Sequence, residues 1–332
     1  MVPPTDLKPT TGPSWVPRLA LGLALGLLTF LAFGLWADLG RLGDAASRFA
    51  WAWMLPVLAL SLANYGLRFL RWQIYLRAAR IDVPTGFSAG VFASGLAMSI
   101  TPGKLGEILK TALLKDGAGV SAARSFPVVV TERLSDLVAV LALTCVGLAA
   151  GLGNTGVLLA GAGLTVAMFL VLATGPGTRL TFRAFAILAR RKLPEEAFAE
   201  ARETQRRLWA PVPLIAGMLL GTLAWFAEAA GLYVVVSAFP EGALGLAPAV
   251  FIYALGTLAG ALSFLPGGLV ATEATLAVLL AAQGFPGVDP ATADALAVAS
   301  TLLIRLATLW FAVGLGGLGL IWLGARRKAS RS

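Results

Sequence analysis

The sequence predicts an all-α polytopic membrane protein with about six transmembrane spans and two re-entrant or broken helical hairpins in an inverted repeat. Hydrophobic residues make up 58% of the 332 residues and charged residues 13%, and the mean hydropathy is +0.83. Several apolar runs exceed the length needed to cross a hydrocarbon core about 30 Å thick. Two further apolar segments are each interrupted by a Pro-Gly pair, at residues 102–103 and 266–267. A water-soluble fold is excluded, because the chain lacks the polar residues for a soluble surface.

The composition also narrows the range of possible functions. The net charge of +9 comes mostly from loops and tails, so it reports the membrane topology. Nucleic-acid binding is excluded, because the basic residues flank apolar runs and form no soluble face interleaved with aromatic residues. The chain has no histidine, the commonest general base and transition-metal ligand, and it has no P-loop and no H-E-x-x-H motif. We therefore expect no metal, no cofactor and no ATP-driven pumping by this chain.

We expect a single transmembrane domain over residues 18–325, between a disordered cytoplasmic segment at 1–17 and a basic cytoplasmic tail at 326–332. Gly22 and Gly26 form a G-x-x-x-G motif in the first span, which indicates close helix packing and is compatible with a homo-oligomer. Aromatic residues near the ends of the second span are expected to anchor it at the membrane surfaces, namely Trp51, Trp53, Trp72 and Tyr75. Full spans are expected at 19–36, 51–76, 124–151, 157–174, 211–239 and 295–323.

The segments around the two Pro-Gly pairs are too short to cross the membrane singly, at about 1.5 Å per residue. They are residues 87–100 and 104–114 in the first case, and 246–265 and 268–283 in the second. Each pair is expected to form either a re-entrant hairpin or a discontinuous helix pair. The expected hinge residues are Pro102, Pro266 and Gly267.

The distribution of Lys and Arg sets the orientation of the chain. Basic residues concentrate in both termini, in the loops near residues 77–80 and 115–124, and in the polar segment 176–209, which is expected to be an amphipathic loop. We therefore place these segments and both termini on the cytoplasmic side of the cytoplasmic (inner) membrane. The first hairpin then enters from inside and the second from outside, as in the inverted repeats of many secondary transporters. Repeat 1 is expected at about 51–151 and repeat 2 at about 211–323.

Nine ionisable side chains fall inside the predicted membrane segments. An isolated charge at mid-bilayer costs about 2.5–3.5 kcal/mol even on a lenient scale, so nine unpaired charges would exceed the stability of a domain. These side chains must therefore pair, line water, or both. One interpretation is structural, with salt bridges of Glu132 or Asp136 to Arg133 and of Glu273 to Arg305; the other is functional. The nine are Lys104, Glu107, Lys110, Glu132, Arg133, Asp136, Glu228, Glu273 and Arg305.

The first hairpin has the features of an anion site. Thr101 is suited to cap a short helix and Pro102 to occupy its first position, so a helix is predicted to start at Gly103. The free N–H groups of this helix would lie beside the Lys104 cation inside the membrane, and that combination attracts anions. In the second hairpin Gly268 stands in the place of Lys104, so the two sites are not chemically equal.

Four motifs resemble those of a known family. They are N-Y-G-L-R-F-L-R-W at 64–72, S-I-T-P-G-K-L-G-E at 99–107, T-E-R-L-S-D at 131–136 and S-F-L-P-G-G-L-V-A-T-E at 263–273. They are similar to those of the lysylphosphatidylglycerol synthase transmembrane-domain, or flippase-like, family, which includes the membrane half of the multiple peptide resistance factor. The resemblance covers most of residues 50–325. It implies translocation of lipids between leaflets, with aminoacylated phosphatidylglycerol, other phospholipids or polyprenyl-phosphate-linked lipids as candidate cargo. The aminoacyl transfer of the resistance factor belongs to a separate soluble domain, for which this chain has no room, so synthase activity is not implied.

We therefore expect a transporter, not an enzyme: a flippase that moves an anionic lipid between leaflets by alternating access. The residues expected to bind the lipid phosphate are Lys104, Arg133, Arg305, Arg68, Gly103, Thr101 and Ser99. Arg68 and the nearby Arg71 either line the cytoplasmic side of the cavity or extend to lipid headgroups. The residues expected to balance these charges, or to carry a coupling proton or cation, are Glu107, Asp136, Glu273 and Glu132. Two alternatives stay open: an intramembrane transferase acting on a lipid-linked substrate, with two carboxylates as acid and base, and a non-catalytic scaffold.

Overall fold

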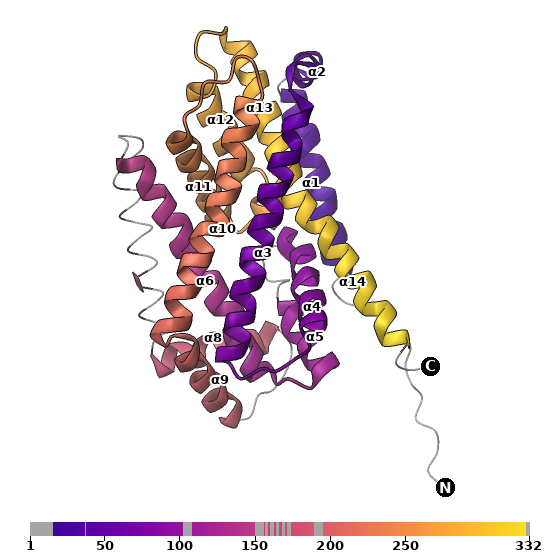
Figure 1. Ribbon diagram of the computed structural model, residues 1–332, viewed down its shortest axis with the longest axis vertical. Coiled ribbons are helices and arrows are strands. Elements are labelled where there is room, and N and C mark those ends of the chain that lie inside the picture. The colour runs from indigo at the N-terminus through magenta and orange to yellow at the C-terminus, as the bar shows by residue number, and fades with distance from the viewer. Residues whose placement is uncertain are drawn as a thin grey trace.

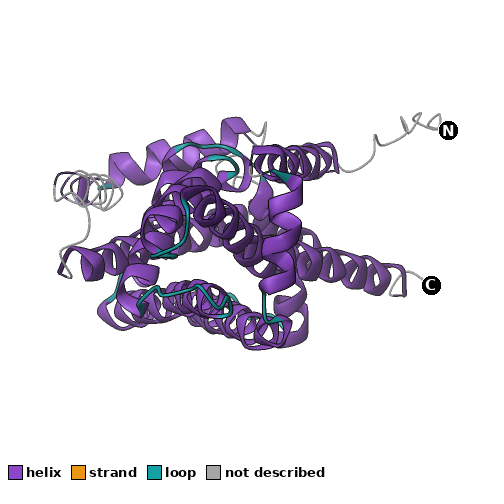
Figure 2. Ribbon diagram, turned by 90° about the horizontal axis from the view of Figure 1, so that it is seen from above, coloured by secondary structure: helices purple, strands orange, loops and turns teal. Residues whose placement is uncertain are grey.

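The computed structural model describes residues 16–36, 38–101, 108–149, 174–188 and 195–329, with single positions between 156 and 170. Over these residues the chain consists of helices and connecting loops, without strands (Figure 1 and Figure 2). The span predicted at 157–174 falls largely outside them. Four described stretches are long and apolar enough to cross a membrane, or five if the bent pair α1–α2 counts as one span. They confirm the all-α polytopic membrane protein, and they are Trp51–Ala78, Pro211–Ser237, Pro266–Gln283 and Pro290–Arg326.

The chain begins with α1 (Val16–Trp36) and α2 (Leu39–Arg48), which meet at a bend of 93°. The two glycines of the G-x-x-x-G motif bring α1 against the rest of the molecule. A Cβ atom at Gly22 would lie 2.7 Å from the carbonyl oxygen of Ile100, and one at Gly26 would collide with the ring of Trp310. The predicted close packing is therefore confirmed, and the partners of both glycines belong to the same chain.

The first half of the molecule consists of α3 (Met54–Ala78), α4 (Thr85–Ala97), the short 3-10 helix η2 (Met98–Ile100), α5 (Leu109–Ala118) and α6 (Ala122–Ala149). The apolar helices α4 and α5 pack against each other as the two limbs of the first predicted hairpin. α5 ends at Gly119, whose φ of 67° is a left-handed conformation that glycine adopts at little cost. The tip of this hairpin, residues 102–107, lies outside the described residues, and so does the helix start predicted at Gly103.

The second half consists of α10 (Pro211–Ser237), α11 (Leu246–Leu262), η4 (Pro266–Gly268), α12 (Ala271–Gln283), α13 (Pro290–Arg305), the π-helical η5 (Leu306–Trp310) and α14 (Phe311–Ala329). Between the packed limbs α11 and α12 the backbone is broken at Gly267 and Gly268, whose φ values are 62° and 66°. A side chain at either position would be strained, so the Pro-Gly-Gly sequence fits the break. The predicted span at 295–323 lies within one longer stretch, and its π-helical segment was not predicted.

Corresponding helices of the two halves form corresponding contacts. α3 lies beside α10, while α4 packs on α14 and, correspondingly, α11 packs on α6. The breaks of the two hairpins, η2 and η4, also meet. In Figure 1 the limbs α4 and α5 lie towards the lower end of the molecule, and α11 and α12 towards the upper end. The two hairpins thus enter from opposite ends, which is the arrangement expected of an inverted repeat.

The polar segment predicted as an amphipathic loop contains two helices, α8 (Gly175–Leu188) and α9 (Glu195–Leu208). α9 packs along α6. Phe182 of α8 lies between Phe126 and Phe198, at centroid distances of 5.9 and 5.6 Å. These apolar contacts hold the two helices against one end of the helical bundle (Figure 1).

Two of the four predicted membrane-surface anchors are wrong. Trp51 and Trp53 are exposed as expected, but Trp72 and Tyr75 are fully buried. The physical reason is that α4 and α10 cover the last turns of α3, so that the aromatic side chains there fill the core. The indole N–H of Trp72 donates a hydrogen bond to the Ser88 hydroxyl of α4 at 2.9 Å.

Candidate functional site

Three arginines surround one carboxylate at the junction of α3, α6 and α10. Asp136 lies 2.8 Å from Arg71 Nη1, 2.9 Å from Arg133 Nη2 and 3.9 Å from Arg68 Nη2. The indole N–H of Trp225 on α10 donates to the same carboxylate at 3.1 Å. α3 supplies Arg68 and Arg71, and α6 supplies Arg133 and Asp136. We call these four charged residues the arginine cluster.

The arginine cluster is buried deep in the bundle. The side chain of Arg71 is fully buried, and those of Arg68 and Arg133 are 9% and 26% exposed. At about 1.5 Å per residue, Arg68 lies about 15 Å inside the end of α3. Of the two interpretations left open for Arg68 and Arg71, extension to lipid headgroups is therefore excluded. Both side chains point into the protein, towards Asp136.

Several N–H donors in this cluster have no acceptor in the protein. Arg68 Nε, Arg71 Nε and Arg71 Nη2 are buried and have no hydrogen-bond partner among the described residues. A buried donor left without an acceptor costs about 1–3 kcal/mol, and more when the group is charged. In native proteins, water or ligand oxygens accept hydrogen bonds from such donors. The arginine cluster is thus able to bind an anion with several acceptor oxygens.

Lys110 belongs to a separate ion pair that links the first hairpin to α6. Its ammonium group lies 2.5 Å from Glu132, and both side chains are buried. The same ammonium group lies 4.6 Å from the centre of the Trp72 ring. Of the two carboxylates predicted as partners of Arg133, Asp136 forms the salt bridge, while Glu132 pairs with Lys110.

A third ionic contact holds the break in the second hairpin. Arg305, at the end of α13, donates from Nε to Glu273 at 2.5 Å and from Nη2 to the Gly267 carbonyl at 2.8 Å. Glu273 in the first turn of α12 is fully buried, and Arg305 is nearly so. The predicted pairing of Glu273 with Arg305 is present. One cation faces one anion, so this site is electrically neutral.

Two buried tyrosine hydroxyls form hydrogen bonds between helices of the bundle. The Tyr65 hydroxyl, one turn before the arginine cluster on α3, donates to the Thr308 carbonyl in η5 at 2.6 Å. The Tyr253 hydroxyl donates to Glu228 at 2.7 Å. Sequence reasoning had noted Glu228 as a charge in the membrane, but it missed both tyrosines and Trp225. No sequence signal separates these aromatic side chains from ordinary core residues, because their polar contacts come from helices distant in the chain.

Part of the predicted anion site at the first hairpin can be located. Ser99 and Thr101 are buried where η2 ends. Thr101 has an extended backbone, and its hydroxyl donates to the Met98 carbonyl at 2.6 Å. The capping helix would start in residues that the structure does not describe, so its anion site stays a prediction. The predicted site residues that lie outside the described part are Pro102, Gly103, Lys104 and Glu107.

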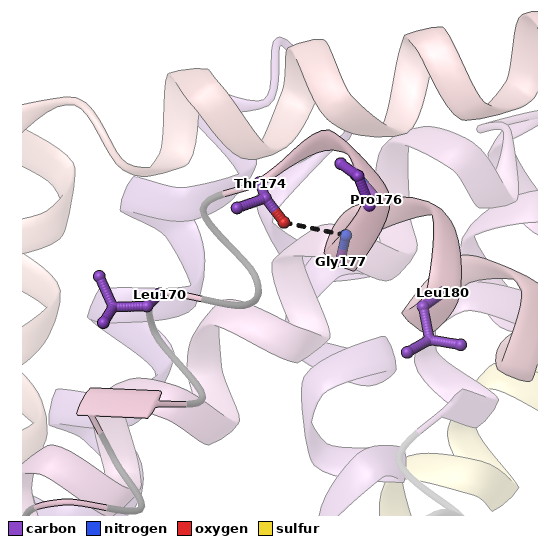
Figure 3. Close-up of a pocket in the computed structure, with 5 residues that line it drawn as sticks. All are labelled: Leu170, Thr174, Pro176, Gly177 and Leu180. Carbon is purple, nitrogen blue, oxygen red and sulfur yellow. Dashed lines mark hydrogen bonds between the residues drawn. The ribbon is translucent and has the colours of Figure 1, made fainter.

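One described cavity lies away from the charged residues discussed above. It has a volume of about 440 Å³ and lies at the start of α8. Its lining is apolar apart from Thr174, whose hydroxyl accepts a hydrogen bond from the Gly177 amide at 3.1 Å (Figure 3). None of its described lining residues is charged, so these residues give no basis for recognising an anion. The residues that line it are Leu170, Thr174, Pro176, Gly177 and Leu180.

The sequence matches one family over most of its length. Residues 19–316 match the family described as the lysylphosphatidylglycerol synthase TM region. Two proteins of Methanothermobacter thermautotrophicus, both described as UPF0104 membrane protein, are each 25% identical to this chain. The alignments cover 92% of this chain and 96% of the first relative, and 89% of this chain and 90% of the second. The family match includes the arginine cluster and both hairpins, and the chain therefore belongs to the lysylphosphatidylglycerol synthase transmembrane-region family.

Proposed function

We propose that the protein moves an anionic lipid between the two membrane leaflets by alternating access. The observation that carries this proposal is the arginine cluster, in which buried guanidinium donors have no acceptor among the described residues. Charged residues inside a membrane are costly and mark substrate or ion pathways. The oxygens of a lipid phosphate would supply the acceptors that these donors lack. Family membership supports a role connected with membrane lipids.

The two halves of the molecule support the alternating-access part of the proposal. The two hairpins, which lie towards opposite ends of the molecule, meet at η2 and η4. Rocking one half against the other about these breaks would expose the same central site to each leaflet in turn. We assign phosphate binding to Arg68, Arg71 and Arg133, with Lys104 on the first hairpin. Arg305, whose charge is already balanced by Glu273, we assign to holding the hinge.

The test compares two arginines of the same helix. Arg133 belongs to the arginine cluster, whereas Arg124, nine residues earlier in α6, forms a partly exposed salt bridge with Glu200 of α9. The purified protein is reconstituted into vesicles that contain a fluorescent anionic phospholipid, and dithionite quenching measures how fast the lipid crosses between leaflets. We expect Arg133→Gln to reduce this rate at least tenfold and Arg124→Gln to leave it unchanged. Size-exclusion elution and melting temperature verify that both variants are folded.

The outcomes separate the proposal from its alternatives. Wild-type vesicles that move no anionic lipid faster than empty vesicles contradict lipid transport. Equal rates for wild type and folded Arg133→Gln contradict the role of the arginine cluster. Mass spectrometry of the lipids after the assay detects a covalent change, and a product of altered mass would favour the intramembrane transferase instead.

A further inference from the structure

The outward face of α8 is apolar, although this helix lies outside the predicted spans. Two large apolar side chains on this face, Leu180 and Ile187, are 65% and 78% exposed. Pro176 and Ala184 are exposed as well, and the four residues follow one another at spacings of three or four positions, so they share one side of the helix. The opposite side is turned into the protein, where Phe182 is buried. We call Pro176, Leu180, Ala184 and Ile187 the α8 stripe.

Two arginines flank the α8 stripe. Arg179 and Arg183 are both exposed, and each directly precedes a residue of the stripe in the chain. Arg179 pairs with Glu195 at 3.0 Å, but the two side chains are 52% and 68% exposed, and such a surface pair is weak. The sequence of α8 contains no acidic residue. The outward face therefore combines apolar side chains with cations, which is the pattern of a helix that lies in a membrane surface.

The neighbouring helix α9 has the opposite pattern. No large apolar side chain of Glu195–Leu208, a range that the structure describes throughout, is exposed. The sequence of α9 holds four glutamates and three arginines, and its outward side is charged. Both helices lie at the same end of the bundle, and the span α10 begins at Pro211, three residues after α9 ends. At this level of the molecule, the contrast favours water around α9 and lipid around α8.

The cavity at the start of α8 extends the same apolar surface. Pro176 and Leu180 of the α8 stripe belong to the lining of this cavity, which has a volume of about 440 Å³ (Figure 3). A lipid acyl chain is an apolar occupant that matches such a lining. Because Arg179 adjoins Leu180 in the chain, a guanidinium group lies beside the apolar surface on which the acyl chain would rest, and guanidinium groups bind phosphate oxygens well.

We infer that α8 binds an anionic phospholipid of the membrane surface, with an acyl chain against the α8 stripe and the phosphate at Arg179 and Arg183. The distribution of Lys and Arg along the chain predicts that this end of the molecule faces the cytoplasmic leaflet, whose anionic lipids attract basic segments. The site is separate from the arginine cluster, and the inference does not depend on the proposed function.

The test compares two exposed alanines, one on each helix. In a background that lacks the single cysteine, Cys145, the substitution Ala184→Cys labels the α8 stripe and Ala199→Cys labels the outward side of α9. Each variant carries the same fluorescent label, and the full chain is placed in nanodiscs so that both membrane surfaces are accessible. The quenchers are doxyl-labelled phosphatidylglycerol, doxyl-labelled phosphatidylcholine at the same mole fraction, and aqueous iodide.

We expect doxyl-phosphatidylglycerol to quench the Ala184→Cys label about fivefold more than doxyl-phosphatidylcholine does. A single arginine at a membrane surface contributes roughly this factor in affinity for anionic lipid, and Arg179 is shared with Glu195. Iodide should quench the Ala184→Cys label weakly. The Ala199→Cys label should behave in the opposite way, with strong quenching by iodide and weak quenching by both lipids.

A charge-removing variant provides the second arm of the test. Arg179→Gln/Arg183→Gln should abolish the preference for phosphatidylglycerol over phosphatidylcholine, while Arg202→Gln, on the exposed side of α9, should keep it. Salt at 1 M, where the Debye length is about 3 Å, should weaken the preference in the wild type. Size-exclusion elution verifies that the variants are folded. If the double variant does not fold, the salt dependence decides the question.

Three results would overturn the inference. Iodide quenching that is as strong for Ala184→Cys as for Ala199→Cys would show that α8 faces water. Equal quenching by the two lipids, unchanged by salt and by the double variant, would contradict recognition of an anionic headgroup. Shielding of the Ala184→Cys label from all three quenchers, with cross-links between copies of the chain at this residue, would assign the surface to a second copy. None of these measurements follows lipid movement between leaflets, so their failure and the failure of the proposed function are distinguishable.

Discussion

Removing one partner of the Arg305–Glu273 pair should destabilise the protein more than removing both. In Arg305→Met, the Glu273 carboxylate loses a partner at 2.5 Å while it stays fully buried. Breaking a buried pair in this way costs about 3–5 kcal/mol, because a charge is left without compensation. The Gly267 carbonyl also loses its donor at 2.8 Å, which adds about 1–3 kcal/mol if it stays unsatisfied. In Glu273→Leu the uncompensated charge is that of Arg305.

The double variant Arg305→Met/Glu273→Leu removes both charges and keeps the side-chain volumes similar. Buried pairs replaced by apolar residues are often close to neutral in stability. The remaining cost is the Gly267 carbonyl, at about 1–3 kcal/mol if it stays unsatisfied. The double variant should therefore be more stable than either single variant, by about 2 kcal/mol.

The measurement is equilibrium unfolding in mixed micelles, followed by tryptophan fluorescence. Arg48 and Glu241 form a matched control pair, with a distance of 2.8 Å but side chains that are 46% and 22% exposed. Their double-mutant cycle should give a coupling of at most about 1 kcal/mol, as expected for surface pairs. A cost below about 1 kcal/mol for Arg305→Met alone would refute the reasoning. So would a double variant that is as unstable as the sum of the two single variants.

Three further predictions concern packing, orientation and pH. Gly26→Ala should lower the melting temperature because the added methyl group collides with a tryptophan ring, whereas Gly66→Ala, in open space on α3, should raise it through about 0.5–1 kcal/mol of helix propensity. In a cysteine-free background, Lys115→Cys should react with a membrane-impermeant maleimide only from the cytoplasmic side and Arg41→Cys only from the opposite side, and the reverse pattern would invert our topology. Hydrogen bonds from Thr292 hold the pKa of Asp289, at the start of α13, below its usual value. The stabilisation by ionised Asp289 is therefore present at neutral pH and is lost as the pH falls from about 4 through the pKa of Asp289 in the folded protein. The melting temperature of Asp289→Asn should therefore change less over that pH range than the melting temperature of the wild type.

The sequence was sufficient to predict the architecture because membrane helices leave strong local signals. Apolar length located the described spans, and the Pro266-Gly267 pair located the break in the second hairpin. Proline fixes φ and lacks an N–H donor, and glycine adopts a positive φ at little cost, in any environment. The Glu273–Arg305 and Asp136–Arg133 pairs were also foreseen as one of two interpretations. Few other partners lie in the predicted spans, and a charge in a membrane must find one.

The contacts between distant helices could not be read in the same way. Arg71 was left undecided because its surroundings depend on how α6 and α10 pack against α3, and a one-dimensional pattern does not contain that information. Trp72 was misplaced for a related reason, since an aromatic residue near the end of a span is buried or exposed according to its neighbouring helices. The π-helical segment after Arg305 left no signal either, because its sequence is apolar like that of an ordinary helix.

The arginine cluster and the Arg305–Glu273 pair call for different explanations, and their comparison bears on function. Salt bridging alone accounts for Arg305, because one acid balances its charge and a backbone carbonyl accepts a further donor. The same account is insufficient for Arg68 and Arg71, which share one carboxylate with a third arginine and keep buried donors without acceptors among the described residues. The residues of α10 that lie 164 positions after Arg68 and Arg71 are Leu232 and Val235, and both are well packed. Stability alone would therefore favour apolar residues on α3 as well. Under the proposed function, these two costly cations are retained for an anion that binds and leaves, which is what a transporter requires and what a static scaffold does not.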